Sequence, residues 1–236
     1  MFLRKSLTGA VAAIAALGLA TGAVAQDPEV ALEAKVAPAK AGTKRKPKNS
    51  RLTFGMTVNL PTATVEVIRL KWPKTMKLSG KGFARCNFDD LVATGPSACP
   101  DKSSAGPQGA ASAAVGPARA PLNFEVNAFV EDANTLLFYL NQAGGGVQSV
   151  VRGEIRGREM TITIPEELRK PGGLDATLTA LDYTFSARSG RNFLVSTTGC
   201  RRRSHRLTGT LVFSPRVDLA PVPAPISSTV ALPCRP

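Results

Sequence analysis

The sequence contains one histidine, and its four cysteines include no pair spaced as CxxC. A structural zinc ion takes four cysteine or histidine ligands, mostly from such close pairs, so a zinc site is not expected. The sequence also lacks a GxSxG turn, an HExxH helix and a phosphate-binding glycine loop. These absences exclude the enzyme classes that those motifs identify. We therefore expect no metal, no cofactor and, outside carboxylate chemistry, no catalytic residue.

Long helical periodicity is also missing beyond residue 25. Apolar and polar residues instead alternate in short segments, including 52–60, 63–67, 122–130 and 207–213, which is the pattern of half-buried strands. Turn signals separate these segments about every 8 to 12 residues, as in a sandwich or a barrel. The sequence predicts an all-β fold: a two-layer antiparallel β-sandwich forming a single domain over residues 51–236, with short helical turns near 88–93 and 166–170.

The first 50 residues differ in composition from the rest. Arg4 and Lys5 precede an apolar run over residues 7–20, and residues 23–25 supply the small side chains that a signal peptidase reads. Cleavage of a 1–25 signal peptide near Ala25 is expected, giving a secreted or cell-surface protein without a transmembrane segment; a retained membrane anchor is the alternative. Residues 26–50, rich in Ala, Lys and Pro, are predicted to be a disordered basic leader, either a spacer or an arm for an acidic polymer.

All four cysteines follow residue 25, and an even number of cysteines in an exported chain favours disulfides. Three pairings are possible. The nearest-neighbour pairing, Cys86 with Cys99 and Cys200 with Cys234, is the one we predict. In the chain-entropy model these two loops stabilise the fold by about 3 and about 4 kcal/mol.

The first cysteine pair has a distinctive setting. Lys81-Gly82-Phe83 precedes Cys86, Gly95-Pro96 and Ala98-Cys99-Pro100 follow, and Ala105-Gly-Pro-Gln-Gly-Ala110 comes next. This sequence pattern resembles that of a set of secreted actinobacterial proteins of unknown function, over about 40 residues from Lys71 to Ala110. The resemblance implies an exported β-rich domain and carries no activity.

Basic residues dominate the charge. The formal net charge is +13, and removal of Arg4 and Lys5 with the signal peptide leaves +11. Two clusters are candidate binding residues for an anionic polymer: Lys71, Lys74, Lys77, Lys81 and Arg85, and then Arg201, Arg202, Arg203 and Arg206. Trp72 and Phe83 within the first cluster are typical of a nucleic-acid or polysaccharide surface, although a solvated loop anchored by Trp72 is the alternative. The second cluster, with His205, either projects toward an anionic partner or is a solvated turn beside a disulfide.

These observations predict an exported, non-catalytic β-domain of the cell envelope that binds an anionic wall polymer through basic faces, with no specific nucleic-acid partner. A structural surface protein without a specific ligand is one alternative. A carboxylate-based polysaccharide hydrolase is another, using Asp89 with Asp90 or Asp175 with Asp182. The sequence does not predict the oligomeric state.

Overall fold

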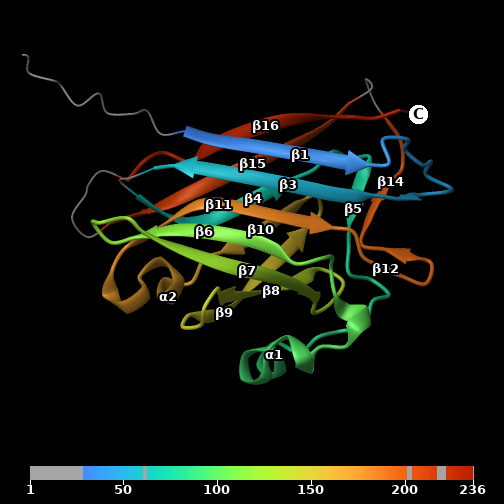
Figure 1. The fold of residues 1–236 in the computed structure, drawn as a ribbon. Coiled ribbons are helices and arrows are strands. Elements are labelled where there is room, and N and C mark those ends of the chain that lie inside the picture. The colour runs from blue at the N-terminus through green and yellow to red at the C-terminus, as the bar shows by residue number, and fades with distance from the viewer. Residues whose placement is uncertain (1–28, 61–62, 201–203, 217–221, 236) are drawn as a thin grey trace, which may run out of the picture.

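The computed structural model describes residues 29–60, 63–200, 204–216 and 222–235. Its main feature is one antiparallel sheet of 11 strands (Figure 1). In spatial order these are β1 (Glu29–Ala37), β3 (Arg51–Asn59), β11 (Ala176–Phe185), β6 (Gly109–Val115), β7 (Ala120–Val130), β8 (Thr135–Gln142), β9 (Gln148–Arg156), β10 (Glu159–Thr163), β4 (Ala63–Lys71), β15 (Ser204–Pro215) and β16 (Ile226–Pro233). The predicted all-β fold is confirmed.

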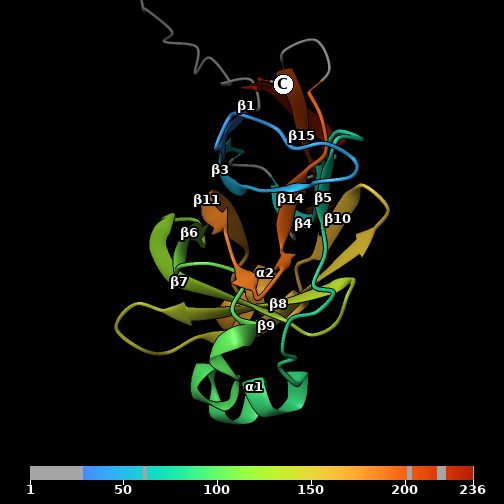
Figure 2. The same ribbon diagram turned by 90° about the vertical axis from the view of Figure 1, so that its right-hand side faces the viewer.

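The two layers of the predicted sandwich belong to this one sheet. It curls until its edge strands β1 and β16 lie side by side, so the molecule is nearly barrel-shaped (Figure 2). A short parallel bridge joins the two ends of the sheet where the edge strands finish: the Arg235 N–H donates to the Ala39 carbonyl and the Ala41 N–H to the Arg235 carbonyl, both at 2.8 Å. Strand twist explains how a single sheet can supply both layers.

Period-two alternation puts the apolar side chains inside. Along β3, Leu52, Phe54 and Met56 are buried, whereas Thr53 and Thr57 are exposed. Strands β6 to β10 form a continuous meander of hairpins, and the alternating segment predicted at residues 122–130 lies in β7. Residues 174–187 contain the single strand β11, with an irregular register beside β6 between Leu178 and Ala180.

The predicted disorder of the leader is wrong for the part that the structure describes. Residues 29–37 form β1, which pairs with β3 along its whole length, from Glu29 opposite Asn59 to Ala37 opposite Arg51. Leu32 and Val36 are buried, while the intervening Glu33 and Lys35 are exposed. Because the alternating positions are partly alanine, the strand pattern is weak in composition, and pairing with β3 supplies what local propensity does not. The predicted signal peptide lies outside the described residues.

Smaller elements gather at one end of the molecule. A three-stranded sheet joins β2 (Lys48–Asn49), β14 (Val195–Thr197) and β5 (Met76–Leu78), and β12 (Arg188–Ser189) forms a hairpin with β13 (Asn192–Phe193). The Cys200–Cys234 disulfide, with a Cα–Cα distance of 5.8 Å, ties the segment after β14 to the chain end after β16. These elements, the 38–47 loop and the C-terminus share the right-hand end in Figure 1.

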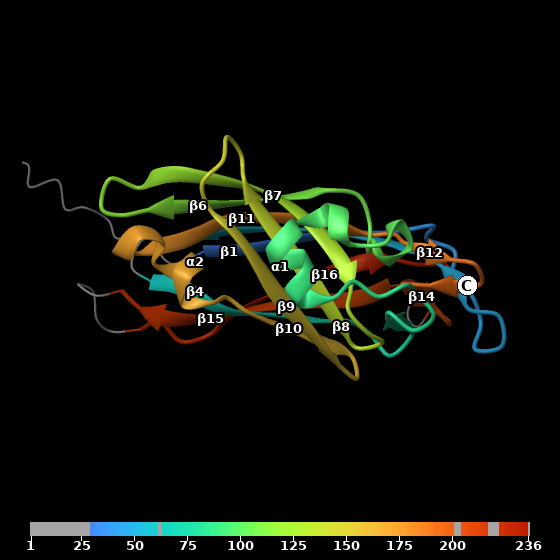
Figure 3. The ribbon, with the colours of Figure 1, turned by 90° about the horizontal axis from the view of Figure 1, so that it is seen from below.

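The other disulfide, Cys86–Cys99, encloses the helix α1 (Phe88–Thr94) and a 3₁₀ turn at Pro96–Ala98, and a further 3₁₀ turn follows at Asp101–Ser103. The Asn87 side chain caps α1 by accepting the Asp89 N–H at 2.8 Å. Leu91, Cys86, Phe129, Leu137 and Tyr139 form a second apolar cluster, because α1 covers the outer face of the sheet (Figure 3). Both predicted disulfides are confirmed.

The second predicted helical turn is also present. It consists of α2 (Glu166–Arg169) followed by a 3₁₀ turn at Pro171–Gly173. This segment contacts β4 and β11 and lies at the end of the molecule opposite the small sheet (Figure 1). Within the described part of the chain, no helix has the length and apolar character needed to cross a membrane.

Candidate polyanion-binding surface

Basic residues from distant parts of the chain meet at the end that carries the small sheet. We call this region the cationic end. It comprises Lys40, Lys44, Arg45, Lys46, Lys48, Arg51, Arg69, Lys71, Lys74, Lys77, Arg188, Arg191, Arg206 and Arg235. All are exposed except Lys48, which is half-buried.

Strand pairing brings the two predicted basic clusters together. Lys71 on β4 lies opposite Thr208 on β15, so the Arg206 side chain is its diagonal neighbour, about 7–8 Å away between Cβ atoms. The loop after β4 is fixed to the same region, since the Thr75 hydroxyl is 3.1 Å from His205 Nδ1 and the Thr75 carbonyl accepts the Thr198 N–H at 2.8 Å. Lys71, Lys74 and Arg206 therefore form one surface.

The leader adds its charges to the same end. Lys48 of β2 pairs with Thr197 of β14, and Thr197 pairs on its other side with Met76 of β5. The buried Ser50 hydroxyl lies 3.2 Å from that of Thr197 and fixes this contact further. The basic run at residues 44–48, at least 147 residues away in sequence from β14, thus lies beside β14, and β14 separates it from β5 and its Lys77 in the same small sheet.

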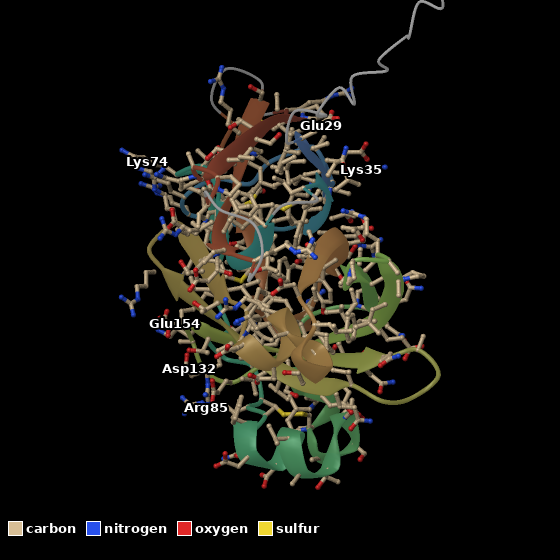
Figure 4. All side chains as sticks on the ribbon, turned by 90° about the vertical axis from the view of Figure 1, so that its left-hand side faces the viewer. Glu29, Lys35, Lys74, Arg85, Asp132 and Glu154 are labelled. Atoms are coloured by element: carbon tan, nitrogen blue, oxygen red, sulfur yellow. A yellow bond between two sulfur atoms is a disulfide. The ribbon has the colours of Figure 1, made fainter. Side chains whose placement is uncertain are left out.

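The basic residues of the cationic end form no ion pair with a carboxylate in the described ranges, although Glu159 of β10 lies opposite Lys71 of β4. Residues 34–65, 67–88 and 183–217 contain no Asp or Glu. Within the described ranges, carboxylates form ion pairs only with Arg152, Arg156, Lys170 and Arg216, none of which belongs to this end. Lys74 points outward among other nitrogen tips, on the side of the molecule opposite Lys35 (Figure 4). Clustered charges of one sign attract polyanions and raise encounter rates.

Two predicted binding residues lie apart from this surface. The Gly80 N–H donates to the Ala133 carbonyl at 3.0 Å, and the Cys86 N–H donates to the Val130 carbonyl at 2.8 Å. Lys81 and Arg85 therefore run beside the β7–β8 turn, which carries Glu131 and Asp132, and Figure 4 shows Arg85 and Asp132 on the same part of the molecule. Arg201, Arg202 and Arg203 lie outside the described residues, immediately before the first residue of β15.

The aromatic residues of the first cluster are not a stacking surface. Trp72 is 1% exposed and Phe83 is 9% exposed, and both belong to the hydrophobic core. The nucleic-acid-like interpretation of this stretch is therefore wrong, and the loop is anchored by Trp72 as in the alternative. Two buried side chains leave no π face for a base or a sugar ring.

His205 does not project with its basic neighbours. It is 2% exposed, because alternation along β15 turns His205 and Leu207 inward and Arg206 outward. Burial lowers the pKa of its imidazole, since the charged form loses hydration. The side chain serves as a neutral partner of Thr75 and contributes no positive charge near neutral pH.

The predicted carboxylate pairs are not assembled. Asp175 lies 3.5 Å from Arg216 Nε, and seven residues of extended chain, about 23 Å, separate it from Asp182. Glycosidase carboxylates stand at most about 9.5 Å apart. Asp89 and Asp90 are exposed in the first turn of α1 and face no enclosed space. No described group of three or more His, Cys, Asp or Glu side chains could hold a metal ion.

Sequence reasoning missed one carboxylate arrangement. Asp182 on β11 and Glu33 on β1 lie opposite each other across Gly55 of β3, where the missing side chain leaves an open groove of about 190 Å³. Both carboxylates are exposed and Lys35 also lines the groove. The pairing depends on β1, whose position could not be predicted from a segment interpreted as disordered.

Comparison with protein-family models, with curated proteins and with solved structures finds no match. The resemblance of the Cys86–Cys99 region to secreted actinobacterial proteins therefore stays a prediction.

Proposed function

We propose that this protein binds an anionic polymer of the cell envelope, such as a teichoic-type or acidic wall polysaccharide, through the cationic end. The observation that carries the proposal is the convergence onto one end of the molecule of Arg235 and of basic residues from three acid-free stretches, residues 34–65, 67–88 and 183–217. A basic composition alone would scatter these charges over the surface. Their concentration at one end gives the molecule a positive pole that an extended polyanion can follow.

The geometry suits a ligand with repeating negative charges. Arg69 and Lys71 are two residues apart on the outer face of β4, about 6.6 Å between Cα atoms, and Arg206 continues the row on β15. Two pairs of hydroxyl groups lie beside these basic residues on the same face. The hydroxyls of Thr208 and Thr229 are 2.9 Å apart, and those of Thr210 and Ser227 are 2.7 Å apart. Charges and hydroxyls together offer ionic and hydrogen-bonding contacts along a flat surface.

An extracellular location fits this role. Two disulfides and the absence of free cysteine among the described residues are compatible with an oxidising compartment. The proposal includes export by a signal peptide cleaved near Ala25 and retention at the envelope by charge. Exposed charges are screened over about 8 Å at physiological ionic strength, so the attachment weakens as salt rises.

The test compares two variants with the same net charge. Lys74→Gln with Arg206→Gln removes two charges from the cationic end, whereas Arg119→Gln with Lys170→Gln removes two charges from the opposite end. Binding of the mature protein to a purified teichoic-type polymer is measured at low and high salt. The first variant is expected to bind about 2- to 30-fold more weakly, since each exposed charge pair contributes about 0.2–1 kcal/mol. The second variant is expected to bind as the wild type.

Equal affinities of the two variants would reject the cationic end as the binding surface. Binding that is absent even at low salt would favour a structural surface protein without a polymer ligand. Thermal unfolding midpoints of both variants serve as the folding control, because three of the four side chains are exposed and Lys170 is half-buried in an ion pair with the exposed Glu166.

A further inference from the structure

The interior of the curled sheet is not completely filled. Two adjoining cavities, of about 60 and about 50 Å³, lie between its layers and share the lining residues Ala111, Leu140, Ile164 and Leu178. The inner cavity reaches Phe138 and Tyr183, and the outer one reaches Leu168 and Arg169 beside α2. Well-packed interiors have few voids larger than a water molecule, so a continuous hollow of this kind is unusual.

Small side chains on two strands create the space. β6 carries Ala111 and Ala113 at positions that face the interior, and Ala176 begins the adjacent β11. Leu140, Ile164 and Leu178 point into the same hollow, yet they remain only partly buried because the cavity is open to them. An apolar cavity of about 150 Å³ stays dry in water and takes up small apolar molecules.

The outer cavity ends at a charged group. The Arg169 guanidinium is half-buried and is held by two hydrogen bonds, from Nε to the Ile164 carbonyl at 3.1 Å and from Nη1 to the Ser214 hydroxyl at 2.8 Å. Ser214 is in turn fixed by the Thr64 hydroxyl at 2.7 Å. No carboxylate pairs with Arg169 in the described ranges. A partly desolvated guanidinium without an anion is suited to a carboxylate, which it can bind through two parallel hydrogen bonds.

We propose that this cavity binds a small monocarboxylate with a short apolar tail, the carboxylate lying on Arg169 and the tail between Ala111 and Leu178. The apolar lining favours the tail by burial, and the single cation selects the head group. The volume restricts the tail to a few carbons, which excludes long-chain fatty acids without rearrangement. This site is at the opposite end of the molecule from the cationic end and is independent of polymer binding.

Access to the cavity passes α2. This helix contacts β4 and β11, the strands on either side of the outer cavity, and Leu168 and Arg169 belong to it. Gly172 and Gly173 follow with positive φ values, and a side chain at either would meet nothing within 4 Å. This segment is open to solvent at both glycines and lies next to the outer cavity, so it is the entry path that the proposal implies.

Hexanoate is the probe for the test, with hexan-1-ol as the head-group control and acetate as the tail control. Binding to the mature protein is followed by NMR of the Ile and Leu methyl groups. Hexanoate is expected to shift the methyl signals of Leu140, Ile164 and Leu178, and to bind at least 10-fold more tightly than either control. Absence of these shifts at millimolar hexanoate would overturn the proposal.

Three variants separate the contributions. Arg169→Gln is expected to weaken hexanoate binding at least 10-fold while leaving hexan-1-ol binding unchanged, and Arg119→Gln, a charge-matched change outside the cavity, is expected to change neither. Ala111→Leu fills the space common to both cavities and should abolish hexanoate binding. If this variant does not fold, Ala113→Leu, which fills the outer cavity, is tested in its place. Unchanged affinity in Arg169→Gln would refute carboxylate recognition, and unchanged affinity in a folded cavity-filling variant would refute the location.

Discussion

At the residue scale, the single histidine shows that alternation along a strand, and not the character of the neighbouring residues, decides whether a side chain is buried or exposed. His205 stands among arginines in the sequence, yet its side chain is buried against Thr75, whereas that of the next residue, Arg206, is exposed. Its imidazole is kept neutral by burial, and its hydrogen bond holds the Lys74 loop against β15. His205 therefore does not belong to the exposed basic surface but holds the loop that carries Lys74 in place.

This burial predicts a pH dependence of stability. The unfolded chain binds a proton at His205 near pH 6.5, whereas the folded chain binds it only at lower pH, so the unfolded state holds more protons in between. The free energy of unfolding should therefore fall as the pH drops below about 6.5 and stop falling below the folded-state pKa. Urea denaturation between pH 7.5 and 5 measures it.

His205→Leu should remove this slope. His205 is the only histidine of the chain, so the comparison isolates the contribution of this imidazole. A slope of the same size in the variant would show that the pH dependence has another origin.

At the element scale, β1 carries more of the fold than its composition suggests. Its buried side chains cover one edge of the core, and truncating them should lower the stability of the whole sheet. Leu32→Ala is expected to lower the free energy of unfolding by about 2–5 kcal/mol. Glu33→Ala, at the next and exposed position, should change it by less than about 0.5 kcal/mol. Chemical denaturation measures both changes. An unchanged free energy of unfolding in Leu32→Ala would mean that this segment behaves as a spacer in solution.

The Cys86–Cys99 loop is a separate element with its own small core. Replacing both cysteines by serine should lower the free energy of unfolding by about 3 kcal/mol and leave α1 free to lift from Phe129 and Tyr139. Limited proteolysis should then cut between residues 88 and 98 before the rest of the chain. Simultaneous cleavage throughout the domain would contradict a local role, and the same exchange at Cys200 and Cys234 is the control.

Local pattern explains which elements could be predicted. Residues 51–59 and 122–130 alternate strongly, and the capping Asn87 and the proline before Glu166 mark both short helices. The remainder depends on non-local pairing. Nothing near Lys71 in the sequence indicates that Thr208 will lie beside it, and nothing in the alanines of β6 indicates that the facing layer will leave them uncovered. The individual basic residues were therefore predictable, but not their common surface or the cavity.

At the scale of the whole molecule, the two ends have different chemistry. The cationic end gathers exposed bases from the leader, β4, β5, β15 and the C-terminus, whereas the α2 end carries Glu166 and Glu167 and the mouth of an apolar cavity. A polymer held at one end would leave the other accessible. The two proposals can therefore be tested separately in the same protein.

The meeting of β1 and β16 has a further consequence. An exposed strand edge is a template on which another chain can add a strand, and this is a common route to aggregation. Here the two edges of the sheet face each other and are joined at one end through Arg235, so each shields the other from a third strand. Growth of intermolecular β-structure would require this seam to open first, so the closed seam slows the addition of further strands.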